Sequence, residues 1–136
     1  MYLVDTNIWL ELLLNQTRSK EVQQFLDTVP SEHLCITDFA YHSMAVVLSK
    51  LGHSEALLKF AEDAFTEGAV SLIHLESEDT PRIVSTMTKY NLDFDDAYQY
   101  VAAVTHNLVL VSFDSDFDRT ERGRKTPEEI FLNPKP

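Results

Sequence analysis

Short apolar runs alternate along the chain with longer segments in which apolar residues recur every three or four positions. The short runs suit buried strands, and the i, i+3, i+4, i+7 spacing predicts amphipathic helices. We expect strands at 2–4, 33–36, 69–75 and 108–111, and the segment 127–132 could supply a fifth. The helical pattern covers 8–13, 22–29, 37–51, 54–67, 78–90 and 97–106.

This order of elements predicts an α/β fold. Strands that alternate with helices form a parallel sheet covered on both faces. We therefore expect a three-layer α/β/α sandwich with a short parallel sheet of four to five strands. A chain of 136 residues, 44% of them hydrophobic, is long enough to bury one core, so we expect a single domain over 1–136.

Two of the predicted strands end on polar residues. Asp5, Thr6 and Asn7 follow the first strand, and Ser112 and Asp114 follow the strand at 108–111. Ligands of parallel sheets bind beyond the carboxyl ends of the strands. If these two strands are neighbours, about 4.8 Å apart, their terminal carboxylates face one another. The alternative is that Asp5 or Thr6 only caps a helix and that Asp114 only suits a turn.

A third acidic group stands at the start of the helix over 97–106, as Asp93, Asp95 and Asp96. Carboxylates brought close together favour a shared cation, and oxygen ligands suit Mg²⁺ or Mn²⁺. Such an ion can promote hydrolysis of a phosphodiester. The alternative for Asp96 is a purely structural role, because acids stabilise the first turn of any helix.

Charge argues against a nucleic-acid-binding surface over the whole molecule, because the net charge is −11. Four of the 11 basic residues nevertheless fall between positions 119 and 125, directly after the acidic segment 114–118. This basic loop could bind RNA phosphate beside the acidic centre, or it could be a solvated turn. Its members are Arg119, Arg122, Arg124 and Lys125.

The cysteine, aromatic and histidine side chains are predicted to have structural roles. Cys35, the only cysteine, lies in an apolar run and is expected to be buried. Trp9, Tyr98 and Tyr100 are expected to pack in the core. Four of the five histidines show no metal-ligand spacing and are expected to be structural: His33, His53, His74 and His106. The sequence shows no signal peptide and no run of about 20 apolar residues, which predicts a cytoplasmic protein with no membrane contact.

Taken in order, these motifs resemble the PIN domain family, and most closely its VapC-type toxins. The resemblance rests on Asp5-Thr6-Asn7, on Asp96-Ala97 with Ala102-Ala103, and on the segment 112–117, Ser-Phe-Asp-Ser-Asp-Phe. It implies a ribonuclease that depends on Mg²⁺ or Mn²⁺, forms a homodimer, and has an antitoxin partner that blocks the acidic cleft. It also implies that Asp5, Asp96 and Asp114 hold the ion and are catalytic, supported by Thr6, Asn7, Ser112 and Asp116.

One departure from the family pattern concerns the helix that starts near Asp38. The family usually carries a glutamate in its second turn, and this chain has Tyr41-His42-Ser43-Met44 there. Asp38 and His42, four residues apart on one helix face, could replace it, with His42 as a weak ligand. The interpretation favoured by the sequence is that Asp38 is a first-turn acid and His42 a surface or half-buried imidazole.

Two other functions remain open at this stage. The missing glutamate and the acidic surface would suit a non-catalytic module of the same fold that binds RNA or a protein. A phosphatase of the haloacid dehalogenase type also begins with a strand ending in Asp. That chemistry needs a second acid two positions later, where this chain has Asn7.

Overall fold

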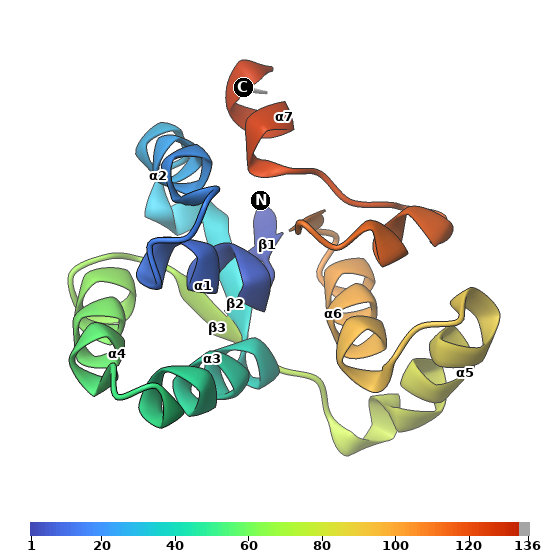
Figure 1. The fold of residues 1–136 in the computed structure, drawn as a ribbon. Coiled ribbons are helices and arrows are strands. Elements are labelled where there is room, and N and C mark those ends of the chain that lie inside the picture. The colour runs from blue at the N-terminus through green and yellow to red at the C-terminus, as the bar shows by residue number, and fades with distance from the viewer. Residues whose placement is uncertain (134–136) are drawn as a thin grey trace.

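The computed structural model describes residues 1–133. In that range four parallel strands form one sheet in the order β3-β2-β1-β4 (Figure 1). The strands are β1 (Tyr2–Val4), β2 (Leu34–Thr37), β3 (Ser71–Ile73) and β4 (Val109–Val111). The helices are α1 (Thr6–Leu13), α2 (Ser19–Thr28), α3 (Asp38–Lys50), α4 (Ser54–Ala61), α5 (Thr80–Tyr90), α6 (Phe94–Thr105) and α7 (Pro127–Leu132).

The strands β2, β1 and β4 bury side chains on both faces of the sheet, as the strand pattern predicts, whereas the edge strand β3 is largely exposed. Successive side chains of a strand point to opposite faces. Val4, Ile36 and Val111 enter the core that α1, α2, α3 and α4 cover. Their neighbours in sequence enter a second core against α6: Leu3, Cys35 and Leu110. Figure 1 shows α1 to α4 on one side of the sheet and α5 and α6 on the other. The α/β/α sandwich is confirmed.

The central position of β1 decides where the polar strand ends lie. Val4 is in register with Val111 of β4, and the amide of Asp5 donates to the carbonyl of Val111 at 3.0 Å. On the other side β1 pairs with β2, whose last residue is Thr37. Asp5, Thr37 and Ser112 therefore come to the same edge of the sheet, which confirms that the strands ending near Asp5 and Asp114 are neighbours.

The segment 127–132 is a helix, so the prediction of a fifth strand there was wrong. Pro127 occupies the first turn of α7, and the Thr126 hydroxyl accepts from the amide of Glu129 while the Glu129 carboxylate accepts from the amide of Thr126. Proline at a helix start and this reciprocal capping box both favour a helix. The apolar residues of α7 then pack beside α2, with Ile130 in the core (Figure 1).

The packing predictions are confirmed for the cysteine, the tryptophan and the two tyrosines, while a structural role of four histidines stays a prediction. Cys35 is buried, as are Trp9, Tyr98 and Tyr100. His33, His53, His74 and His106 are exposed. Among the described residues, no helix combines the length and the apolar character that crossing a membrane would require.

A short 3-10 turn, η4 (Ser115–Arg119), follows β4 and is held to the sheet by one aromatic side chain. Phe117 is fully buried and belongs to the core cluster that includes Leu3 and Leu110. Its burial fixes the turn that carries Asp114 at its N-cap and Asp116 within it.

We expect Phe117→Ala to lower the free energy of unfolding by about 3–5 kcal/mol, because it empties a fully buried site. Phe94→Ala is the matched control. Phe94 is 42% exposed, so the same truncation there should cost only about 1 kcal/mol. Urea denaturation of both variants tests the expectation, and equal losses would contradict it.

Candidate active site

The carboxylate of Asp5 is buried at the end of β1 and accepts hydrogen bonds at both oxygens. Oδ1 accepts from the amide of Thr6 at 2.8 Å and from Nε2 of Gln99 at 3.0 Å. Oδ2 accepts from the Ser112 hydroxyl at 2.8 Å and lies 3.5 Å from Nδ2 of Asn7. A buried carboxylate is stable only with such donors. Asp5 therefore ties α1, α6 and the end of β4 together.

The supporting residues predicted after β1 and β4 form one network. Nδ2 of Asn7 donates to the Ser112 hydroxyl at 3.2 Å, and Oδ1 of Asn7 accepts from the amide of Phe113 at 3.2 Å. The Ser112 hydroxyl also accepts from the amide of Asp114 at 3.0 Å. This network fixes the backbone that leads from β4 to Asp114.

Gln99 is the member of the network that the sequence analysis missed. It lies in the second turn of α6, is 2% exposed, and links Asp5 to the buried hydroxyl of Thr37, which donates to its Oε1. The available signal was its position three residues after Asp96, which places both on one face of the helix. Through Gln99, α6 is fixed against the ends of β1 and β2.

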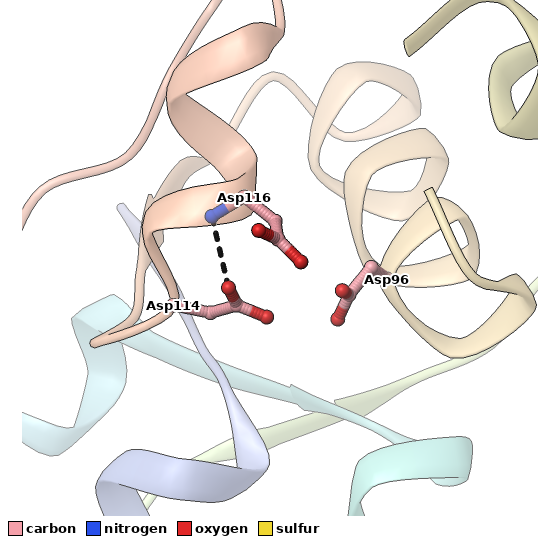
Figure 2. Close-up of side chains that lie close together, drawn as sticks. All are labelled: Asp96, Asp114 and Asp116. Atoms are coloured by element: carbon pink, nitrogen blue, oxygen red, sulfur yellow. Dashed lines mark hydrogen bonds between the residues drawn. The ribbon is translucent and has the colours of Figure 1, made fainter. Parts of the chain in front are cut away.

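Three other carboxylates form an acidic cluster beside this network: Asp96, Asp114 and Asp116 (Figure 2). One oxygen from each lies within 4.8 Å of the others. Asp96 belongs to the first turn of α6, and its side chain faces Asp114 and Asp116 across the gap to η4. Oδ1 of Asp114 accepts from the backbone amide of Asp116 at 2.9 Å, which fixes the Asp114 side chain against the start of η4.

Asp5, Asp96 and Asp114 line one cavity of about 220 Å³. The structure therefore brings together the three aspartates that the sequence singled out. Thr6, Asn7, Gln99 and Ser43 also line this cavity. Hard divalent cations such as Mg²⁺ and Mn²⁺ prefer oxygen ligands, and the chemistry of the acidic cluster fits one of them.

The electrostatics of the cavity favour a cation. Burial raises the pKa of the Asp5 carboxyl, against the lowering effect of its hydrogen bonds from Ser112, Gln99 and Thr6. Partial burial, together with the charges of Asp114 and Asp5, raises the pKa of Asp96 to about 7. Like charges at close range destabilise the ionised form, and a bound cation would relieve that repulsion.

Asp38 and His42 do not belong to the acidic cluster. Both line a neighbouring groove, together with Phe39, Ser43, Val46 and Tyr98. Oδ1 of Asp38 accepts from the amide of Phe39 at 2.8 Å and from the Tyr98 hydroxyl at 2.8 Å, while His42 is exposed. The contacts of Asp38 are those of a first-turn acid. A role of Asp38 and His42 as substitutes for the family's glutamate stays a prediction.

The basic loop contacts the protein itself. Arg119 donates to the carbonyls of Tyr90 and Asn91 at 3.0 and 2.7 Å, and to Asp116 at 3.3 Å. The other two arginines also have protein partners: Arg122 contacts Asn107 and Leu108, and Arg124 contacts Ser112 and Asp118. Lys125 lies 3.9 Å from Glu129. These contacts brace the loop, and phosphate binding by it stays a prediction.

Comparison with known proteins assigns the family. A sequence model described as "PIN domain" matches residues 2–123 of the 136. The chain belongs to the PIN domain family. This assignment places the Asp-Thr-Asn strand end in a PIN domain and not in a haloacid dehalogenase. A sequence search of curated proteins gives no match.

Solved structures similar to this PIN domain share its fold at low sequence identity. A toxin-antitoxin complex from Klebsiella pneumoniae aligns with a TM-score of 0.74 and 23% identity, covering 93% of this chain and 98% of the other. VapC20 from Mycobacterium tuberculosis, a toxin that cleaves the sarcin-ricin loop, aligns at 0.74 and 15%, covering 87% and 93%. FitAcB from Neisseria gonorrhoeae aligns at 0.71 and 18%, covering 93% and 98%.

The raised pKa of Asp96 makes the stability of the metal-free PIN domain depend on pH. The folded protein holds a proton up to about pH 7 that the unfolded chain releases near pH 4, so stability falls as pH rises through this window. We expect the urea midpoint in chelator to fall between pH 5 and pH 8.

Asp96→Asn should remove most of this fall and stabilise the metal-free protein at pH 8 by about 1–2 kcal/mol, after allowance for solvent screening. Asp27→Asn, at an exposed position on α2, is the matched control and should follow the parent. An unchanged pH slope in Asp96→Asn would show that Asp96 does not carry the effect.

Proposed function

We propose that this PIN domain is a metal-dependent endoribonuclease that acts in the cytoplasm as the toxin of a toxin–antitoxin pair. The observation that carries the proposal is the acidic cluster, in which Asp96 of α6 and Asp114 at the N-cap of η4 line a cavity at the carboxyl ends of the strands and Asp116 lies close to both. Such a site suits the hydrolysis of a phosphodiester, which develops negative charge that an acidic protein cannot stabilise without a cation.

Asp96, Asp114 and Asp116 are the proposed holders of the ion. When bound there, Mg²⁺ or Mn²⁺ supplies an activated water and stabilises charge on the phosphate. Asp5, Asn7 and Ser112 hold the backbone of the site in place through their hydrogen bonds. Asp5 as a direct ligand stays a prediction, because both of its oxygens already accept hydrogen bonds.

The helix α3 contributes a hydroxyl and no carboxylate to the cavity, since Ser43 is the residue of its second turn that lines it. The family pattern has a glutamate in this turn, so the site of this chain carries one negative charge fewer beside α3. We therefore propose that it holds a single ion. Arg119 lies beside Asp116 and is the member of the basic loop best placed to contact a phosphate at the cluster.

The proposed substrate and partners draw on the similar structures. One of these is a toxin-antitoxin complex, and VapC20 is a toxin that cleaves the sarcin-ricin loop. By analogy, RNA is the proposed substrate of this chain. A homodimer and an antitoxin that blocks the acidic cavity are its proposed assemblies.

Incubation of the protein with single-stranded RNA and Mn²⁺ tests the nuclease. We expect cleavage that chelator abolishes and that Asp114→Asn lowers by about 10²–10⁴-fold, because stabilisation of charge by the ion contributes several kcal/mol. The exposed Asp27→Asn should cleave like the parent.

Two results would contradict this function. Cleavage that persists in Asp114→Asn or in chelator would remove the proposed mechanism. No cleavage, and no heat of Mn²⁺ binding in a calorimetric titration, would favour the non-catalytic module instead.

The toxin assignment is tested in cells. Expression of the chain alone should arrest growth, and expression of Asp114→Asn should not. Equal growth with the parent and Asp114→Asn would contradict the assignment. Light scattering tests the homodimer, and a mass near that of one chain, 15.6 kDa, would exclude it.

A further inference from the structure

The groove that contains Asp38 opens beside the acidic cavity. Phe39 and Ser43 line both, so the two adjoin on the surface of α3 and α6. An RNA strand bound at the acidic cluster would place its adjoining part in the groove. The occupant of the groove therefore depends on what the cavity binds.

An aromatic wall borders the groove: Phe39 and Tyr98 line it, and the ring of Phe94 packs against both from outside its lining. The Phe39 ring lies 5.4 Å from the Tyr98 ring and 6.1 Å from the Phe94 ring, and the last two lie 6.2 Å apart. Phe94, the first residue of α6, is 42% exposed although it is two residues from Asp96. An aromatic ring exposed beside a nucleic-acid site is a surface on which a base can stack.

The charges around the groove select which part of a nucleotide can enter. Asp38 lines the groove and Asp95 lines the adjoining cavity, and carboxylates repel a phosphate that lacks a cation. A nucleobase carries no charge, and stacking on aromatic rings is favourable for every base. The groove thus suits a base, while the phosphate belongs at the acidic cluster.

Asp38 adds a polar contact of defined direction. Its Oδ1 accepts from the Phe39 amide and the Tyr98 hydroxyl, whereas none of the residues described in the structure donates to its Oδ2. Because Asp38 lines the groove, its carboxylate can accept from an exocyclic amino group there, such as N4 of cytosine. Uracil carries a carbonyl at that position and would be repelled.

We propose that the groove binds one nucleobase of single-stranded RNA next to the phosphate held at the acidic cluster. The base stacks on Phe94 and Phe39, and Asp38 selects a base with an amino group over uracil. This inference rests on the proposed ribonuclease function and adds a substrate preference to it.

Fluorescence anisotropy of labelled C12 and U12 RNA tests the proposal, with Ca²⁺ replacing Mn²⁺ so that binding is measured apart from cleavage. The two probes share a ring and differ in the amino or carbonyl group that Asp38 would contact. We expect the full chain to bind C12 about tenfold more tightly than U12, as for a charge-assisted hydrogen bond.

Phe94→Ala should weaken binding of both probes by about 5–100-fold, and Phe94→Trp should restore it, because stacking needs only an aromatic face. Leu58→Ala, at a position on α4 that is 72% exposed, is the control and should bind like the parent. Binding by Phe94→Ala at parental strength would overturn the proposal.

Asp38→Asn distinguishes base recognition from packing. The contacts at Oδ1 would hold the amide oxygen in place and turn the amide nitrogen, a donor, toward the groove. The preference should then shift from C12 to U12. An unchanged preference would overturn the role of Asp38, and a change in molar mass of Phe94→Ala by light scattering would identify the aromatic wall as a contact between copies instead.

The outcomes separate this inference from the proposed function. If the parental protein binds C12 selectively but cleaves no RNA, base binding in the groove is supported and the proposed ribonuclease function is contradicted. The opposite result is cleavage of RNA by the parent, with each probe bound equally well by the parent, Phe94→Ala and Asp38→Asn. It would support the ribonuclease function and contradict base binding in the groove.

Discussion

The structure depends on the satisfaction of one buried carboxylate. Asp5 lies at the end of the central strand, where an ionised group without donors would cost several kcal/mol. Its donors come from the start of α1, from α6 and from the residue after β4. These elements are far apart in the sequence, so the requirement for hydrogen bonds at one side chain fixes their relative positions.

The acidic cluster shows the opposite arrangement. Asp5 has donors at both oxygens, but Asp96, Asp114 and Asp116 face one another, with Arg119 as a basic neighbour of one of them. Repulsion of this kind opposes folding and is retained where a site needs it. The hydrogen-bonded network around Asp5 supplies the rigidity that keeps the cluster from relaxing apart.

Most of the fold follows from the sequence pattern, because apolar runs of three or four residues and helical periodicity report burial directly. The adjacency of Asp5 and Asp114 was predictable from the same pattern, since both follow strands of a parallel sheet. Gln99 was not, because periodicity does not reveal which distant strand a helix residue faces. The segment at 127–132 was ambiguous because the short apolar run Ile130-Phe131-Leu132 suits a strand or a helix, and its capping residues were the better guide. The basic loop was also ambiguous, since a cluster of arginines does not reveal whether its partners are phosphates or backbone carbonyls of the protein.

The place of β1 in the sheet has a consequence for synthesis of the chain on the ribosome. The strand at Tyr2–Val4 is translated first, yet its partner β4 begins only at Val109. Until β4 has emerged, one edge of β1 stays unpaired, and Ser112 is missing from the surroundings of Asp5. Contacts of such long range close late and slowly. Folding of this PIN domain is therefore expected to finish only after Ser112 has emerged, with an open strand edge that chaperones would have to shield in the meantime.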